Sequence, residues 1–226
     1  MTLNKNTADN ADTQNQETAV RGTEFRTKSY RRHFEGYSEF MEKDASGKLK
    51  LKRVYTGEYH TPDLTEKKRR FNRVLAVILY ICAAVFFAIA CTRPAPCNTS
   101  WIVVLPEIAT LVAWLWSVTL IFSYLTAPHK MTIYEYRCTQ NFVMSLKFTL
   151  TGLIICAVLA IGHGVILARD SLLIELVIGM LFLAAAACLL SVVMREDAVT
   201  YLSYMSEEKA PADAVKITAP DTGFRF

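Results

Sequence analysis

The stretch that most constrains this chain lies at residues 67–91, where a cluster of basic side chains leads directly into an apolar segment. Between Val74 and Cys91 there is no charged residue and no proline. At about 1.5 Å per residue, a helix of these residues nearly crosses a hydrocarbon core roughly 30 Å thick. The stretch therefore predicts a membrane-spanning helix. Its basic cluster is an orientation signal, because cationic loops stay in the cytoplasm, and it consists of Lys67, Lys68, Arg69, Arg70 and Arg73.

Three further apolar stretches follow the first, so the chain is predicted to cross the membrane four times. The expected spans cover about residues 71–91, 106–125, 143–167 and 172–194. The two loops expected outside carry Arg93 and Arg169 as their only basic residues, whereas the other basic residues lie on the opposite side. The positive-inside rule then places both termini in the cytoplasm, as expected of a multi-pass protein of the plasma membrane. The predicted fold class is an all-α membrane protein, an antiparallel four-helix bundle at residues 67–195 with a small cytoplasmic β-hairpin.

Composition supports this division between a membrane body and a soluble arm. Hydrophobic residues make up 52% of the 226 residues, and the charged residues are concentrated outside the apolar stretches. The net charge of +4 is small, and most of the excess lies beside the first span. We interpret this charge as attraction to an anionic inner leaflet and not as a nucleic-acid-binding surface. The expected partners are the lipid bilayer and either a protein partner or a second copy of the chain.

The arm before the first span contains one segment with a strand pattern. Residues 1–25 are polar without any apolar period, so we expect disorder there. Within residues 26–66, residues 48–55 alternate polar and apolar side chains, and residues 44–47 have the composition of a turn. This pattern predicts a β-hairpin over roughly residues 37–60. Residues 131–140 contain a short alternating segment that can add a strand to it, and residues 196–226 are expected to be a flexible tail.

Small residues recur at intervals that allow helices to approach closely in lipid. The pairs are Ala84 with Ala88 and Ala160 with Gly164, and residues 184–188 form a third small-residue run. Such spacing favours backbone contact between helices, because packing must replace the hydrophobic effect inside a bilayer. We interpret these residues as packing positions.

Three polar residues lie inside the predicted spans, where the membrane interior disfavours them. Glu107, His163 and Glu175 all fall near the outer ends of their spans, within about one to two helical turns of the surface. One interpretation is a shared intramembrane site that relays protons or binds a cation. The other is structural: Pro106 and Glu107 suit the first turn of a helix, and Glu175 follows Ser171 as a cap.

The six cysteines contain no C-x-x-C pair, and only Cys91 and Cys97 are spaced to form a disulfide. They would lie in an oxidising outer loop, as a structural bridge or as two free thiols. A redox centre is the third interpretation, although a tighter cysteine pair would be expected for one. No ligand spacing indicates a metal site, and no motif indicates a cofactor or a reaction.

The sequence therefore predicts a membrane protein without naming its ligand. We expect a non-enzymatic component or accessory subunit of a membrane assembly that acts through protein or lipid contacts. The alternative is a small transporter or channel subunit that uses Glu107, His163 and Glu175. A third hypothesis is a membrane thiol oxidoreductase that uses Cys91 and Cys97.

Overall fold

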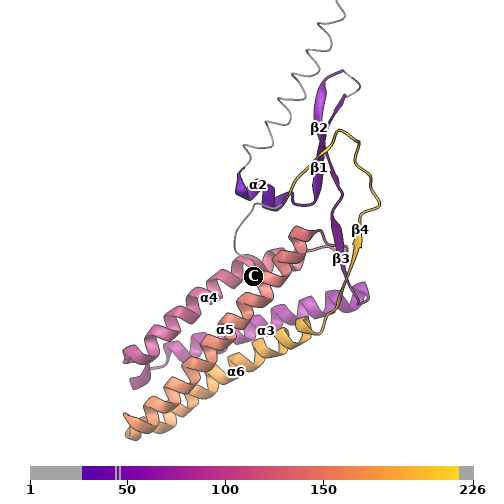
Figure 1. Ribbon diagram of the computed structural model, residues 1–226. Coiled ribbons are helices and arrows are strands. Elements are labelled where there is room, and N and C mark those ends of the chain that lie inside the picture. Colours follow the sequence, from indigo (N-terminus) through magenta and orange to yellow (C-terminus); the bar gives the residue numbers. More distant parts are fainter. Residues whose placement is uncertain (1–26, 44, 46, 219–226) are drawn as a thin grey trace, which may run out of the picture. The chain divides into compact units, whose positions relative to one another are not determined.

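The computed structural model describes residues 27–218 apart from 44 and 46, and it divides into two compact units (Figure 1). The helical unit comprises Thr61–Met131 and Glu135–Leu202. The β unit comprises the described residues up to His60, Thr132–Tyr134 and those from Ser203 onward. The segment predicted to be disordered, residues 1–25, lies outside the described residues.

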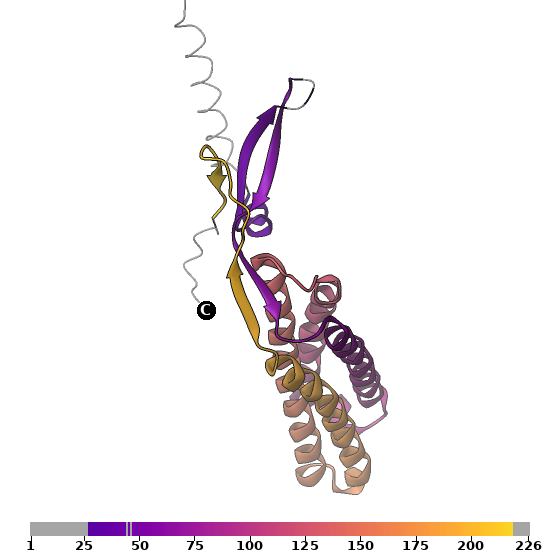
Figure 2. The same cartoon turned by 90° about the vertical axis from the view of Figure 1, so that its right-hand side faces the viewer.

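Four long helices make up the helical unit, and each is long and apolar enough to cross a membrane. They are α3 (Glu66–Thr92), α4 (Trp101–Thr126), α5 (Ile133–Ile166) and α6 (Leu172–Asp197). The short 3-10 turns η1 (Pro96–Thr99) and η2 (Arg169–Ser171) precede α4 and α6. Arg69 at the start of α3 bonds to Glu196 at the end of α6, so these two helices run in opposite directions (Figure 2). The structure therefore confirms four long apolar helices where the sequence predicts four spans.

Helices α3, α4 and α5 all begin before the predicted spans, and for α4 and α5 this changes what the sequence predicted for particular residues. Helix α4 begins at Trp101, so Pro106 and Glu107 lie inside the helix and not in its first turn. Helix α5 begins at Ile133 and runs for 34 residues, so the extra strand expected within residues 131–140 is wrong. The apolar span already provides the costly helix nucleus, and adding turns to an existing helix is inexpensive. The Tyr55 hydroxyl, 3.0 Å away, also accepts a bond from the Ile133 N–H, one of the donors that a helix start leaves free.

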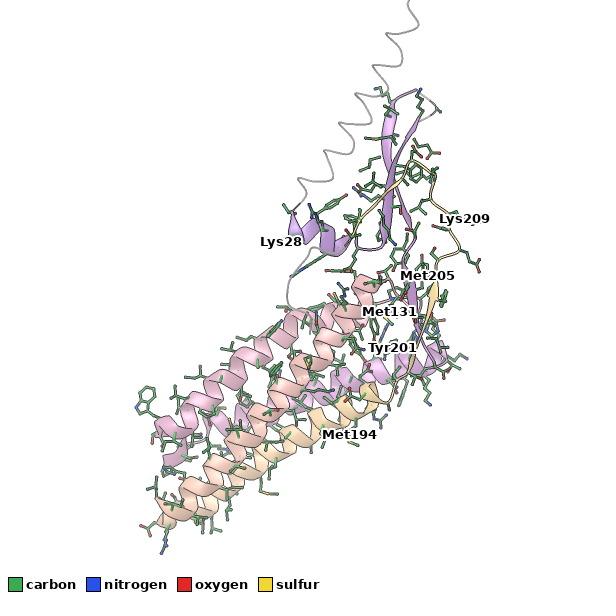
Figure 3. The ribbon with its side chains drawn as sticks, viewed as in Figure 1. Lys28, Met131, Met194, Tyr201, Met205 and Lys209 are labelled. Atoms are coloured by element: carbon green, nitrogen blue, oxygen red, sulfur yellow. The ribbon has the colours of Figure 1, made fainter. Side chains whose placement is uncertain are left out.

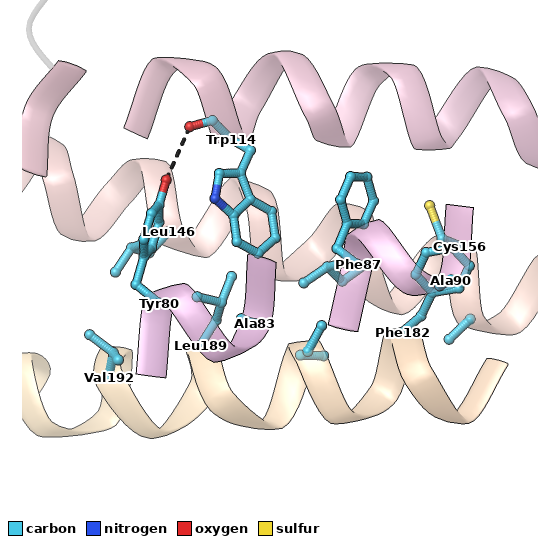
Figure 4. Close-up of a cluster of buried hydrophobic side chains, with 14 of the residues drawn as sticks. Tyr80, Ala83, Phe87, Ala90, Trp114, Leu146, Cys156, Phe182, Leu189 and Val192 are labelled. Atoms are coloured by element: carbon cyan, nitrogen blue, oxygen red, sulfur yellow. Dashed lines mark hydrogen bonds between the residues drawn. The ribbon is translucent and has the colours of Figure 1, made fainter. Parts of the chain in front are cut away.

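The core of the helical unit is built from stripes of residues that repeat at alternating spacings of three and four. On α3 the stripe runs through Ala76, Tyr80, Ala83, Phe87 and Ala90. Figure 4 shows the last four of these residues. This is the spacing of helices that pack side by side along their length. Alanine at three of these positions lets the neighbouring helix approach, and α6 is that neighbour.

The small residues predicted to mediate close approach divide into two groups. Ala160 and Gly164 are buried in the core of the helical unit, as expected of packing positions. Ala84 is half-buried and Ala88 is exposed, so this pair does not form the α3 core stripe. The core residues of α3 lie one position away from them, at Ala83 and Phe87.

The outer surface of the helical unit is apolar, unlike the surface of a protein that folds in water, and several polar side chains are buried in its core. The buried stripe of α4 includes four polar side chains, Glu107, Thr110, Ser117 and Tyr124. Large apolar side chains project outward along all four long helices (Figure 3). They include Val74 and Ile81 on α3, Leu111 and Phe122 on α4, Phe148 and Val158 on α5, and Leu173 and Met180 on α6.

The β unit contains the hairpin that the sequence predicts. Strand β1 (Tyr37–Lys43) pairs antiparallel with β2 (Leu49–Tyr55), and β5 (Val215–Lys216) adds to the other edge of β1. A short helix α2 (Lys28–His33) precedes the hairpin, and β3 (Glu58–Pro62) pairs with β4 (Tyr201–Met205). Gly47, in the predicted turn, has a φ of 76°, a conformation that side chains disfavour.

The segment after the last span is not the flexible tail predicted from its composition, because β4 and β5 both lie in it. The Ile217 N–H donates to the Tyr37 carbonyl over 2.7 Å, and the Ser206 N–H donates to the Gly57 carbonyl over 3.1 Å. Backbone hydrogen bonds to residues far away in the sequence hold this segment in place. Such long-range pairing cannot be read from the composition of the segment itself. Residues 219–226 lie outside the described residues.

Candidate functional site: buried charges at two ends of the helical unit

Glu175 is a fully buried carboxylate with partners on both sides. Its Oε1 and Oε2 lie 3.0 and 2.9 Å from Nδ1 of His163, in the last turns of α5. The backbone N–H of Cys97 in η1 also donates to Oε1 over 3.1 Å. A Cβ on Gly164 would lie 2.9 Å from Cβ of Glu175, so a glycine makes room for this arrangement. Glu175 therefore joins α5, α6 and the turn before α4, since buried carboxylates are stable only when paired.

Glu107 belongs to the same end of the helical unit but is not part of this pair. Its residue is 8% exposed, and no hydrogen bond of its Oε1 is found among the described residues. It lines a cavity of about 400 Å³ together with Ala84, Ala88 and Trp114. Of the three polar residues considered for one shared site, the structure thus pairs His163 with Glu175. No hydrogen bond joins Glu107 to either within the described chain.

The thiols at this end are unbridged. All six cysteines are free, so the disulfide considered between Cys91 and Cys97 is absent from the structure. The Cys97 thiol instead donates to Oδ1 of Asn98 over 3.3 Å. Burial, with a smaller contribution from Glu175, raises the pKa of Cys97 to about 11. Because the thiolate is the reactive form, this environment makes Cys97 a poor nucleophile.

Asn98 closes the end of α3. Its Nδ2 donates to the carbonyls of Ala90 and Arg93 over 2.8 and 2.9 Å, and to that of Cys91 over 3.3 Å. The last carbonyls of a helix have no partner inside the helix, so a side-chain amide stabilises them. Asn98 and Glu175 together fix the loop between α3 and α4.

The opposite end of the helical unit contains a second buried network that the sequence did not predict. Arg69 is 2% exposed, and its Nη1 donates to Oε2 of Glu196 over 2.7 Å. The hydroxyl of Tyr124 donates to the other carboxylate oxygen over 2.6 Å. Nη2 of Arg69 reaches the Tyr201 hydroxyl over 3.1 Å. The network joins α3, α4, α6 and β4, and we call this end the basic end and the Glu107 end the carboxylate end.

The basic cluster of residues 67–73 therefore divides into exposed members and wholly or partly buried members, and only the exposed ones match the expectation. Lys67, Lys68 and Arg70 are exposed, as an orientation signal requires. Arg69 is buried in the network, and Nη1 of Arg73 donates to the Ala127 carbonyl over 2.6 Å, which caps the end of α4. One feature of the sequence could have indicated the Arg69–Glu196 pair. Glu196 follows the fourth predicted span and Arg69 precedes the first, so both are predicted on the same side of the membrane.

Neither a metal-binding group nor a similar protein identifies a function for these buried charges. Among the described residues, no group of three or more histidine, cysteine, aspartate or glutamate side chains is placed to hold a metal ion. The chain matches no protein-family model, and comparisons with curated proteins and with solved structures gave no match either.

Proposed function

We propose that this chain is a multi-pass protein of the plasma membrane, in which four helices cross the bilayer as an antiparallel bundle with both termini in the cytoplasm. The apolar outer surface of the helical unit carries this proposal. Large apolar side chains cover the outside of all four helices, whereas polar and charged side chains are buried between them. Soluble monomers rarely expose apolar patches larger than a few hundred Å². In a bilayer, apolar side chains on the outer surface contact lipid and not water, so their exposure is not unfavourable. Helices also suit a bilayer because their backbone N–H and C=O groups hydrogen-bond to one another.

Within the membrane, we propose a non-enzymatic component or accessory subunit that acts through protein or lipid contacts. Four buried ionisable groups of the helical unit bond to one another, in the His163–Glu175 pair and in the Arg69–Glu196 pair. Such pairs fix the positions of helices, and they leave those groups without an obvious role in moving a solute. The pattern favours a rigid structural member.

The β unit supplies a surface suited to a protein partner. Met41 and Leu51 are directly opposite each other in the β1–β2 hairpin, and Leu49 lies two residues from Leu51 on the same strand face. Their exposed fractions are 45%, 40% and 53%. Three neighbouring apolar side chains on a soluble hairpin favour contact with a protein partner or a second copy of the chain.

The second candidate is a small transporter or channel subunit, and the state of Glu107 favours it. A carboxylate with an unpartnered buried oxygen beside a cavity is the kind of group that binds a cation inside a membrane. Flux of protons or alkali cations into proteoliposomes tests this candidate. Flux above empty liposomes that disappears in Glu107→Gln would replace the accessory role, and flux equal to empty liposomes would remove the transporter.

Membrane threading is tested by labelling single cysteines in a cysteine-free background. Thr99→Cys and Asp170→Cys, both in exposed loop positions, should react with an impermeant maleimide from outside intact cells. Lys209→Cys should react only after the membrane is opened. Labelling of Lys209→Cys in intact cells would overturn the proposed orientation, and labelling of none or all regardless of opening would overturn the four spans.

The accessory role is tested by native electrophoresis of mildly solubilised membranes. The protein should migrate in a complex larger than its own 25.4 kDa and detergent account for. Met41→Lys with Leu51→Lys should release the monomer, whereas the matched pair Lys50→Ala with Lys52→Ala on the other hairpin face should not. Wild-type protein that migrates as a monomer would contradict the proposal.

A further inference from the structure

We propose that the cavity between α3 and α4 binds a lipid-like primary amine, with its ammonium group at Glu107 and its alkyl chain along the two helices. The inference rests on the proposed membrane location for the source of such a molecule. Its physical basis lies in three features of the cavity: the carboxylate, the shape and the apolar lining.

The carboxylate is the first feature. Glu107 lies in the buried stripe of α4, at 8% exposure, and its Oε1 has no hydrogen-bond partner among the described residues. The other buried carboxylates of the helical unit, Glu175 and Glu196, are both bonded to basic side chains. A buried acceptor without a donor is costly. An N–H donor that carries positive charge satisfies both the acceptor and the charge.

The shape of the cavity is the second feature. Glu107 and Trp114 both line it and are separated by two turns of α4, which spans about 10 Å. Opposite them, Ala84, Ala88 and Thr92 recur at every fourth position along α3. The small alanine side chains leave room at the positions where a larger residue would fill the space between the helices. The cavity is therefore elongated along the helices, and its 400 Å³ falls within the range of small-molecule sites.

The lining is the third feature, and it separates a head from a tail. Beyond Glu107, the cavity is lined mainly by apolar side chains, among them Phe87, Leu111 and Trp114. The hydroxyl of Thr92 already donates to the Ala88 carbonyl over 2.8 Å. An anionic head would be repelled by Glu107, and an alcohol would supply a weaker donor than an ammonium group. A quaternary ammonium has no N–H to donate, so a primary amine is preferred.

In the proposed topology, Glu107 lies about 9 Å along α4 from its first residue, below the outer surface. A lipid of the outer leaflet with an amino head group would then place its amine near Glu107 and its chain toward the middle of the membrane. Ethanolamine lipids and free long-chain amines share this chemistry, and the two sources differ in the phosphate that the lipid carries beside its amine.

Fluorescence quenching tests the site on the full-length protein in detergent. Trp101 and Trp116 are replaced by phenylalanine, which leaves Trp114 at the cavity as the only tryptophan, and its emission is excited selectively over that of tyrosine. The probe is a long-chain primary amine brominated near the middle of its chain. We expect saturable quenching, with binding about tenfold or more weaker for the matched brominated alcohol, because a charge-assisted bond is lost. Competition by an unbrominated ethanolamine lipid or by a simple alkylamine then identifies the source.

Variants locate the head and the tail. Glu107→Gln should weaken amine binding to the level of the alcohol, and Ala88→Leu should abolish quenching by both because it fills the cavity. Asp170→Asn is the matched control, because it removes an exposed carboxylate near the start of α6 and should change nothing. Circular dichroism and gel filtration verify that each variant is folded.

Equal binding of amine and alcohol to the wild-type protein would overturn the site without any variant. So would unchanged amine binding in Glu107→Gln. These results are independent of cysteine labelling in cells. If the amine does not bind but cysteine labelling supports four spans, only the amine site is overturned. If the amine binds but the labelling pattern is wrong, only the proposed membrane topology is overturned.

Discussion

The two ends of the helical unit treat buried charge in different ways. At the basic end, Arg69 and Glu196 come from positions far apart in the sequence and meet inside the protein, with two tyrosine hydroxyls bonded to them. Nε of Arg69, and Nε and Nη2 of Arg73, have no partner among the described residues, but both guanidinium groups are bonded through Nη1. At the carboxylate end, Glu175 has the same kind of partnership with His163, while Glu107 keeps an oxygen without a partner. Charges that are partnered hold helices together, whereas an unpartnered charge beside a cavity is available for a ligand.

The largest effect is expected from breaking the Arg69–Glu196 pair. Arg69→Met should destabilise the protein by about 3–5 kcal/mol, because it leaves a buried carboxylate without its counter-charge. Denaturation in mixed micelles with increasing SDS measures the free energy of unfolding. The double variant Arg69→Met with Glu196→Leu should cost less than the sum of the two single changes, by about 1 kcal/mol or more.

The control for this prediction is an ion pair one residue along the same helix. Nη2 of Arg70 lies 3.7 Å from Oε1 of Glu66, and both side chains are exposed. Arg70→Ala should change stability by less than about 0.5 kcal/mol, as is usual for surface pairs. If Arg69→Met is as mild as Arg70→Ala, the basic end is not the rigid anchor that the structure indicates.

The second effect compares the two carboxylates of the carboxylate end. Glu175→Leu should cost about 2–4 kcal/mol, because it removes the acceptor from His163 and from the buried Cys97 N–H. Glu107→Leu should be neutral within about 1 kcal/mol or stabilising, since no bond of its buried oxygen is lost. The same SDS titration measures both.

Double variants sharpen the comparison further. Changes at Glu107 and Glu175 should add, whereas changes at His163 and Glu175 should deviate from additivity by about 0.5–3 kcal/mol, as contacting residues do. Coupling of Glu107 to His163 would instead support the shared site considered from the sequence.

The sequence was sufficient to predict the four long apolar helices but not how they pair. Continuous apolar stretches define the four long helices because membrane helices are recognised by length and hydropathy. The same property hides which helix face is buried, since the outward face is apolar as well. Ala84 and Ala88 were therefore predicted at a helix contact, although the core stripe lies at Ala83 and Phe87. The hairpin was predictable because alternation and turn composition are local signals.

The buried residues of the carboxylate end could be identified from the sequence, whereas those of the basic end could not. Glu107, His163 and Glu175 stand out as polar residues within apolar stretches, so the sequence could nominate them. Arg69 and Glu196 lie among other charges at helix ends, where an exposed position is the usual expectation. Their pairing depends on how α3 and α6 align, and no single stretch of sequence contains that alignment.

A third prediction concerns how tightly Glu175 is enclosed. Gly164→Ala should cost about 1–3 kcal/mol, because the added Cβ would lie 2.9 Å from Cβ of Glu175. Gly162→Ala, on the same stretch of α5, is the matched control because nothing lies within 4 Å of its added Cβ. It should stabilise the helix by up to about 1 kcal/mol. If both changes stabilise, the surroundings of Glu175 are looser than the structure indicates.

The smallest effect is a change in the reactivity of Cys97. Burial and the Glu175 carboxylate raise the pKa of its thiol to about 11, so at pH 8 only about one thiol in a thousand is ionised. Maleimide labelling of folded protein, followed by mass spectrometry, should find Cys97 much slower than the exposed thiol of Thr99→Cys. The rate for Cys97 should rise with pH up to about 11, because the thiolate is the reactive form. Glu175→Leu should accelerate labelling of Cys97, since it removes both a negative charge and the bond that holds the Cys97 N–H, whereas Glu107→Leu should have a smaller effect.

Under denaturing, non-reducing conditions Cys91 and Cys97 should both be alkylated completely, and a peptide pair lacking two hydrogens would instead show that they are bridged.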